Sequence, residues 1–367
     1  MTSLEAFVDV FIKYVHMNHR DHVALIFTYG SYARGKRTPT SDIDLAYITE
    51  TGENDCLYNS FVYNGIGNEF WPISWTRLER IADAQDHYPV SAPMIAYSKI
   101  LWSRSEKDLE RFMALKEKIE EYRKLGKREY MVNKSLETYS EVYTNIAKLS
   151  IEKTLSGTRY LAIKTIIDCS EALGYANQTY FTSGWGSNHN EVLTLKHRPK
   201  NLEKYIDTII SSTSTTEIKT AAETLALETR RILVKLQRET MKPSGLRKHI
   251  TDYYPGIKEY INKIKTATEK EDRIKTAIAA YTVQAELTHM LCHGETGASN
   301  PVFNIPSETK QEYLRYGFAD LLENINTLSD KSDILDRTTQ ILFKKQGINL
   351  NKVENLTEFT KNMKKKC

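Results

Sequence analysis

The chain has 367 residues, of which 40% are hydrophobic and 27% are charged, and its formal net charge is +4. These values are ordinary for a soluble globular protein and argue against a disordered chain. The small excess of basic residues does not demand a nucleic-acid partner, although a locally basic surface can bind phosphates. Length alone predicts about two or three domains.

The cysteines and the apolar segments predict a cytoplasmic protein. Four cysteines stand at scattered positions, without the paired spacing of a zinc site or a disulfide framework, namely Cys56, Cys169, Cys292 and Cys367. The N-terminal segment carries Glu5 and Asp9 and lacks the basic start of a signal peptide. No apolar run approaches the ~20 residues that a bilayer-spanning helix needs.

The first hundred residues combine short apolar runs with helical patterns. After an amphipathic first helix, we predict strands at 22–29, 43–49, 68–74 and 95–102, and a short helix at 76–84. The run at 95–102 would also suit a helix. We therefore expect an α+β domain over residues 1–104, with a mixed sheet of about four to five strands and flanking helices.

From residue 105 onward helical periodicity takes over and strand signals nearly vanish. A polar stretch, SSTSTTE at 211–217, is a candidate boundary within this all-α region. We expect a helical substrate-binding domain over 105–212 and an additional C-terminal helical domain over 213–367.

Two carboxylates stand out in the stretch FTYGSYARGKRTPTSDIDLAYI, which runs from Phe27 to Ile48. Asp42 and Asp44 begin the second predicted strand, and residues two apart in a strand share one face. Magnesium prefers oxygen ligands, so a pair of carboxylates beside substrate phosphates is typical of its sites. Glu69 is the only acidic residue of the third predicted strand and is the candidate third ligand.

A turn in front of these carboxylates has the residues that a phosphate site needs. Gly30 lets the backbone approach a phosphate closely, and Ser31 can donate its hydroxyl and its N–H at a helix start. Arg34, Lys36 and Arg37 add positive charge along the connection. Together these features favour a site for a metal-bound triphosphate.

The Gly-Ser turn, the short connection and the Asp-Ile-Asp-Leu strand resemble the signature of the DNA polymerase beta-type nucleotidyltransferase superfamily. The segment YGSYARGKRTPTSDIDLAYI is most similar to the minimal and the antibiotic-modifying, kanamycin nucleotidyltransferase-like branches. The order of a Glu-bearing strand, a helix, a fourth strand and a helical domain extends the resemblance to roughly the first 210 residues.

The resemblance implies roles for particular residues. Asp42, Asp44 and Glu69 would bind two Mg²⁺ ions, and Gly30 and Ser31 would contact the triphosphate of ATP or another nucleotide. In the antibiotic-modifying enzymes a glutamate of the helical domain is the general base. Here Glu137 and Glu141 are the candidates, of which we favour Glu141, and Lys148 of the same helix would contact phosphates, as would Arg34 of the short helix after the turn.

The function that follows is Mg²⁺-dependent transfer of a nucleoside monophosphate, AMP from ATP, to a hydroxyl of a small molecule such as an aminoglycoside-like antibiotic. Pyrophosphate would be released, and antibiotic resistance would be the biological outcome. The alternatives are a protein or tRNA acceptor, as in toxin–antitoxin or regulatory enzymes, and a vestigial nucleotide-binding interaction protein. The modest net charge argues against RNA. The resembling antibiotic enzyme is a dimer with a shared site, which leaves an oligomer open.

Two further patterns have a functional and a structural interpretation. His289, Cys292 and His293 have a spacing that permits a metal site, but no fourth ligand is evident and core packing is favoured. The loop with Tyr180, Phe181 and Trp185 could line an acceptor pocket by stacking, whereas packing between helices is the more common use of such residues.

Overall fold

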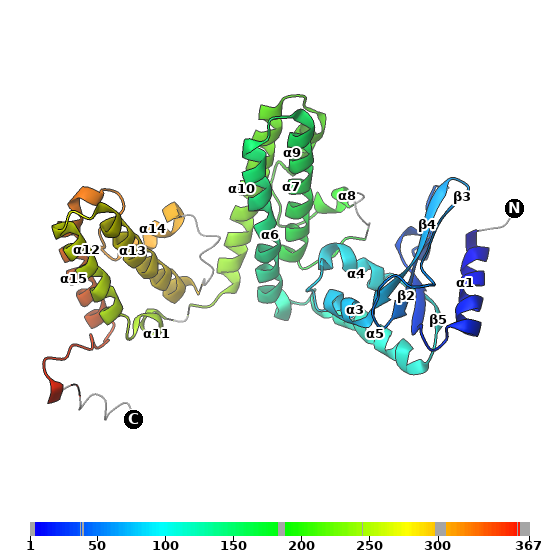
Figure 1. The fold of residues 1–367 in the computed structure, drawn as a ribbon, viewed down its shortest axis with the longest axis horizontal. Coiled ribbons are helices and arrows are strands. Elements are labelled where there is room, and N and C mark those ends of the chain that lie inside the picture. The colour runs from blue at the N-terminus through cyan, green and yellow to red at the C-terminus, as the bar shows by residue number, and fades with distance from the viewer. Residues whose placement is uncertain are drawn as a thin grey trace. The chain divides into compact units, whose positions relative to one another are not determined.

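The structure is a computed structural model that describes residues 4–36, 38, 40–182, 188–243, 245–297, 306–357 and 359. Its contacts divide the chain into two compact units, Met1–Thr240 and Met241–Cys367. Figure 1 shows the sheet and helices of the first unit and the helices of the second. Among the described residues, none of the helices is long and apolar enough to cross a membrane.

A five-stranded mixed sheet forms the N-terminal part of the first unit, as expected from the sequence. Its strand order is β3-β4-β2-β1-β5. Only β2 and β4 pair in parallel, while the other three pairings are antiparallel. The strands are β1 (Leu25–Thr28), β2 (Asp44–Thr49), β3 (Asn59–Tyr63), β4 (Ile66–Ser74) and β5 (Lys99–Ser103).

Alternating side chains give the sheet two apolar faces. Ile26, Leu45 and Tyr47 are buried in one core, together with residues of α1 (Leu4–Asn18). Phe27 and Ala46 belong to the other core, which also contains residues of α3 (Trp75–Ala82), α4 (Tyr88–Ala96) and α5 (Glu106–Glu121). Figure 1 shows α1 on one side of the sheet and these three helices on the other. The period of two thus places both faces against helices, which a central sheet requires.

Two details of this domain differ from the sequence-based prediction. The hairpin strand β3 was not predicted, and the expected strand at 95–102 is divided between the end of α4 and β5. The change from helix to strand comes after Ala96. Tyr97 and Ser98 form the connection, in which Ser98 Oγ donates to the carbonyl oxygen of Ile95 at 2.8 Å.

A helical bundle completes the first unit. After the short helix η1 (Leu125–Lys127) come α6 (Arg128–Ile151), α7 (Leu155–Ala176), α8 (His189–Val192), α9 (Leu202–Ser211) and α10 (Thr215–Thr240). Helix α10 packs on α6, α7 and α9, and Tyr139 of α6 donates its hydroxyl to the carbonyl oxygen of Ala226 in α10 at 2.6 Å.

The compact unit therefore extends to Thr240 instead of ending at the expected limit of residue 212. The polar stretch that suggested a linker is a helix start. Glu217 donates its backbone N–H to Ser214 Oγ at 3.3 Å, and its side chain accepts from Ser212 Oγ at 2.6 Å. Serine and glutamate three residues apart are the capping-box pattern of a helix N-terminus.

The second unit is helical, as expected. It contains α11 (Leu246–Ile250), α12 (Tyr254–Glu269), α13 (Arg273–Thr296), α14 (Pro306–Arg315), η3 (Ile325–Thr327) and α15 (Leu328–Lys345). Its core is separate and includes Ile257, Ile261 and Ile264 of α12. Spacings of three and four residues place these side chains on one face of the helix, against α13 and α15.

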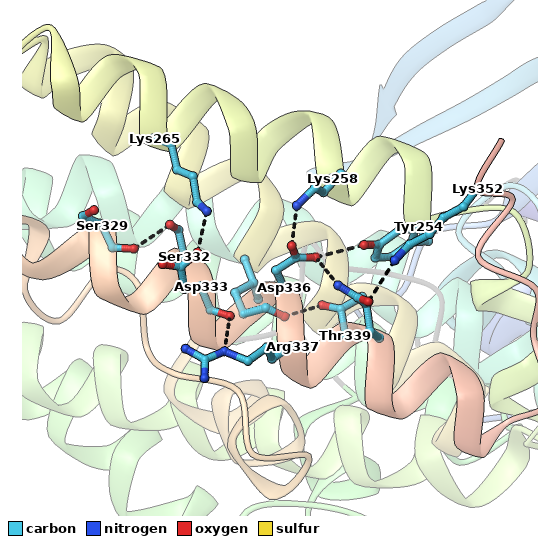
Figure 2. Close-up of polar contacts among 12 residues, drawn as sticks. Tyr254, Lys258, Lys265, Ser329, Ser332, Asp333, Asp336, Arg337, Thr339 and Lys352 are labelled. Atoms are coloured by element: carbon cyan, nitrogen blue, oxygen red, sulfur yellow. Dashed lines mark hydrogen bonds and ion pairs between the residues drawn. The ribbon is translucent and has the colours of Figure 1, made fainter. Parts of the chain in front are cut away.

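Polar contacts join α12 to α15 at the edge of this core (Figure 2). Asp336 of α15 accepts from the Tyr254 hydroxyl at 3.0 Å and forms an ion pair with Lys258. Its side chain is only 13% exposed. Asp333, one turn earlier, pairs with Lys265 but is 52% exposed. The two aspartates thus make the same kind of contact at very different burial.

We expect Asp336→Asn to lower the free energy of unfolding by roughly 2 kcal/mol at pH 7, because a charged hydrogen-bond acceptor is lost in a mostly buried position. Asp333→Asn is the matched control and should leave stability nearly unchanged, since water screens an exposed pair. Urea unfolding of the full chain, followed by circular dichroism, measures both. Equal losses would contradict this assignment.

The stability difference between wild type and Asp336→Asn should also depend on pH. Burial by itself raises the pKa of Asp336, but hydrogen bonds from Lys258, Gln340 and Tyr254 lower it below its usual 3.8 overall. A carboxyl group with a depressed pKa in the folded state adds stability above its unfolded pKa, and this stability is lost as the pH falls through the folded value. The difference between wild type and Asp336→Asn should therefore shrink below about pH 4.

Candidate functional site

Two carboxylates meet where β2 and β4 run in parallel. Asp44, the first residue of β2, pairs in register with Glu69 of β4. Asp44 shares its face of the sheet with Ala46, and Glu69 shares its face with Trp71, and both of these residues pack on the core beside α3, α4 and α5. Neighbouring strands lie only about 4.8 Å apart, so the sheet places the two carboxylates side by side.

A partly buried tyrosine lies within electrostatic reach of all three carboxylates. Tyr29 accepts a hydrogen bond from the Trp71 indole Nε1 at 2.9 Å. Burial raises the pKa of the Tyr29 phenol, and the negative charges of Asp44, Glu69 and Asp42 raise it further. The Tyr29 phenol therefore stays protonated at neutral pH, next to a concentration of negative charge. Sequence reasoning missed Tyr29 and Trp71, although the first directly precedes Gly30 and the second follows Glu69 on the same face.

The carboxyl group of Asp44 has a raised pKa. Burial, with the charge of Asp42 as the second cause, raises the pKa of its carboxyl group to about 6. Among the described residues, no cationic side chain forms an ion pair with it. The Asp44 carboxylate is therefore costly at neutral pH, and a nearby cation would stabilise it.

The donor set suits a hard cation in type, but the side chains do not yet form a closed site. Within the part of the chain that the structure describes, no three His, Cys, Asp or Glu side chains are close enough together to hold a metal ion. The Tyr58 hydroxyl donates to Glu69 Oε1 at 2.8 Å and engages that carboxylate. Oxygen donors on adjacent strands fit Mg²⁺ in chemistry.

The turn before the motif passes directly against Asp44. Gly30 begins α2 (Gly30–Ala33) with φ +66°, and a Cβ atom at this position would stand 2.0 Å from Asp44 Oδ2. Only glycine combines this backbone conformation with so close an approach. Ser31 is partly buried in α2, and Arg34 donates its Nε–H to the carbonyl oxygen of Gly30 at 3.2 Å. Arg37 lies outside the described residues.

Asn68 fixes the strand that carries the aspartates. Its side chain is buried, its Oδ1 accepts from the backbone N–H of Ile43 at 3.2 Å, and its Nδ2 donates to the Ile66 carbonyl oxygen at 2.8 Å. Ile43 lies between the two aspartates, so the Asn68 amide holds the segment that presents them. Asparagine is depleted in strands, and its position next to Glu69 was the signal that could have identified it.

The two candidates of the helical domain lie apart from this group. Glu141 and Lys148 are exposed on α6, and the alternative base, Glu137, pairs with Lys134 at 2.6 Å. Tyr130 in the first turn of α6 donates to the Asp83 carbonyl oxygen, which ties that turn to the end of α3. A rise of 1.5 Å per residue puts Lys148 about 27 Å further along the helix. Lys148 lines a hollow beside the turn into α7.

The aromatic loop and the histidine–cysteine pattern remain to be placed in the structure. Tyr180 is buried, donates its hydroxyl to Glu120 at 2.5 Å and packs edge-on against Tyr88 and Tyr97, so it has a packing role. Trp185 of the same loop lies outside the described residues. The His293 ring lies 4.0 Å from the ring of His249, a residue that the sequence pattern did not suggest, but no metal-binding group of three results among the described side chains.

We expect Asn68→Ala to lower the free energy of unfolding by about 1–3 kcal/mol, because the buried N–H of Ile43 loses its acceptor. Asn68→Asp is the control: it keeps the acceptor oxygen but loses the donor to Ile66, so it should show which of the two bonds matters. Thermal and urea unfolding of both variants provide the measurement. An alanine variant as stable as wild type would contradict the role of this amide.

Comparison with known protein families gives two matches. Residues 12–69 match the family described as polymerase beta, nucleotidyltransferase, and residues 109–239 match the KNTase C-terminal domain. The first match contains the turn and all three carboxylates, and the second ends one residue before the first compact unit does.

The remaining comparisons add little. No curated protein matches the chain. Among solved structures, a nucleotidyltransferase-like protein from Exiguobacterium sibiricum 255-15 is similar, at 11% identity over 67% of this chain and 83% of that one, with a TM-score of 0.32. A likeness at that score carries no argument. The two family matches, however, show that the chain is a nucleotidyltransferase enzyme, with a polymerase beta-type nucleotidyltransferase domain at residues 12–69 and a helical domain of the kanamycin nucleotidyltransferase kind at residues 109–239.

Proposed function

We propose that the protein transfers AMP from ATP to a hydroxyl group of a small molecule such as an aminoglycoside-like antibiotic, with release of pyrophosphate. The observation that carries the proposal is the register of Asp44 with Glu69 on parallel strands, with Asp42 and the Gly30 turn beside them. A helical domain of the KNTase C-terminal kind supports a small-molecule acceptor.

In this proposal Asp42, Asp44 and Glu69 hold two Mg²⁺ ions. Bound Mg²⁺ would lower the pKa of the attacking hydroxyl and neutralise charge on the reacting phosphate. The raised pKa of Asp44 supports this role, because a carboxylate without a counter-charge is ready to accept a cation. The hydrogen bond between Trp71 and Tyr29 would stabilise β4 and the end of β1 next to these carboxylates.

The chain's own residues would then position the substrates. Gly30 lets the triphosphate approach the backbone, Ser31 donates to it, and Arg34 adds positive charge next to the turn. Glu141 is proposed as the base for the acceptor hydroxyl and Lys148 as a phosphate contact. Both are exposed on α6, so a second copy of the chain could supply them to the site of the first.

A macromolecular acceptor is the second candidate. It is favoured by the separate core of the second unit, Met241–Cys367, which lies beyond both family matches and is available for a partner. A protein or tRNA acceptor would use the same carboxylates and differ only in what the helical parts bind.

Incubation of the full chain with Mg²⁺, α-labelled nucleotides and a panel of aminoglycosides tests the acceptor class. Parallel reactions contain a cell extract, in which labelled protein or RNA bands are sought. Labelled aminoglycoside with ATP supports the first candidate. Label confined to a protein or RNA band overturns it in favour of the second.

Asp44→Asn should lower the transfer rate by at least about 100-fold, because a metal ligand matters more than its supporting residues, whose loss alone costs 10–100-fold. The variant should be no less stable than wild type at pH 7, since it removes a charge that burial already disfavours. Initial rates and thermal unfolding are measured on the same samples. Transfer that survives in the folded variant would show that the carboxylates are not the catalytic ligands.

Two glycines provide a matched test of the turn. Gly30 and Gly35 have nearly the same φ, +66° and +67°, but a Cβ on Gly35 would meet nothing within 4 Å. Alanine at either position should therefore lower the free energy of unfolding by about 1–2 kcal/mol through backbone strain. Only Gly30→Ala should also abolish transfer, because the Asp44 carboxylate must turn away. Equal activities of the two variants would contradict the close approach.

A further inference from the structure

A pocket of about 440 Å³ lies in the first unit, outside the carboxylate group. Helix α7 contacts α4, α8 and α9 around it (Figure 1). Its apolar wall residues are Val90 of α4, Ile163, Ile166 and Ile167 of α7, and Ile206 and Ile210 of α9. Its polar lining consists of Ser170 and Glu171 of α7, and of Asn188 and His189 at the start of α8. Ligand pockets of proteins commonly have such a volume, an apolar lining and a few polar groups.

One buried charge faces this apolar space. Glu171 of α7 lines the pocket, and its side chain is only 7% exposed. Its Oε1 is hydrogen-bonded to His87 Nδ1 at 2.8 Å, and among the described residues His87 is its one recorded partner. A buried carboxylate is costly unless all its lone pairs find donors. Among the described residues, the second carboxylate oxygen of Glu171 has no recorded partner, and Glu171 lines the pocket.

His87 itself points mainly to solvent. Its side chain is 58% exposed, and its backbone has a left-handed φ of 44° at the start of α4. It therefore supports Glu171 from the outside and does not fill the space between the isoleucines. Ser170 does not occupy the Glu171 carboxylate either, because the Ser170 hydroxyl donates to the Ile166 carbonyl oxygen at 2.7 Å.

We infer that this pocket binds a small ligand with an apolar body and one basic nitrogen, the nitrogen donating to Glu171 and the body lying against the isoleucines of α7 and α9. The charge of Glu171 favours a cation over an anion, and the isoleucines of the wall favour an apolar body. The inference does not depend on the proposed transfer reaction, because binding alone defines it.

The test measures binding of n-octylamine to the full-length protein by isothermal titration calorimetry, with n-octanol and octanoate as neutral and anionic controls. The amine should bind, and octanoate should not. Glu171→Gln keeps a hydrogen-bond acceptor for His87 and should weaken amine binding about tenfold to a hundredfold, the usual worth of a charged hydrogen bond. Equal binding of the three probes, or an unchanged affinity in Glu171→Gln, would overturn the inference.

Variants at the pocket mouth keep the test independent of the buried residue. Ile210 is 58% exposed, so its replacement should leave folding intact. Ile210→Lys should weaken octylamine binding by charge repulsion, and Ile210→Glu, the matched control, should not. If Ile210→Lys instead converts a dimer into a monomer in sedimentation experiments and no probe binds, the pocket is an interface between copies and the inference is wrong.

Discussion

The parallel pairing of β2 with β4 is the constraint on which the candidate site depends. Because side chains alternate along a strand, a slip of one residue would turn Glu69 to the face beneath α1 and separate it from Asp44. The register is held by the apolar residues that follow each acid, since Ala46 and Trp71 belong to the same core. Asn68 adds a direct bond from β4 to the N–H of Ile43, so the acids and their supports come from the same short segments.

Much of the site could be predicted because its residues are close in sequence. Gly30 begins α2, Asp42 lies two residues before β2 and Asp44 begins β2, so local pattern is enough to place them. Glu69 could be chosen because the third predicted strand has no other acid. The residues that support the carboxylates could not be predicted from local sequence. Tyr29 and Asn68 act through bonds to Trp71 and Ile43, and such pairings depend on strand register, which hydrophobic pattern leaves open.

The missed elements have similar physical reasons. β3 is an edge strand with mostly exposed residues, so it lacks the apolar run of the buried strands. The signal was its turn, since Asn64 and Gly65 both have positive φ, as a tight hairpin requires. The boundary expected at residue 212 rested on composition alone, whereas the compact unit extends to Thr240. Serine and threonine mark both linkers and helix caps, and only the contacts of α10 distinguish them.

The extent of the first unit has a consequence for how the protein is made. Its bundle is complete only when α10 has been synthesised, at Thr240. The 127 residues from Met241 to Cys367 then still have to be translated, which takes about 6–25 s at 5–20 residues per second. Domains generally fold as units during synthesis, the N-terminal one first. The nucleotidyltransferase unit can therefore fold on the ribosome before the second core exists, and errors in the later unit reach a chain whose catalytic half is already formed.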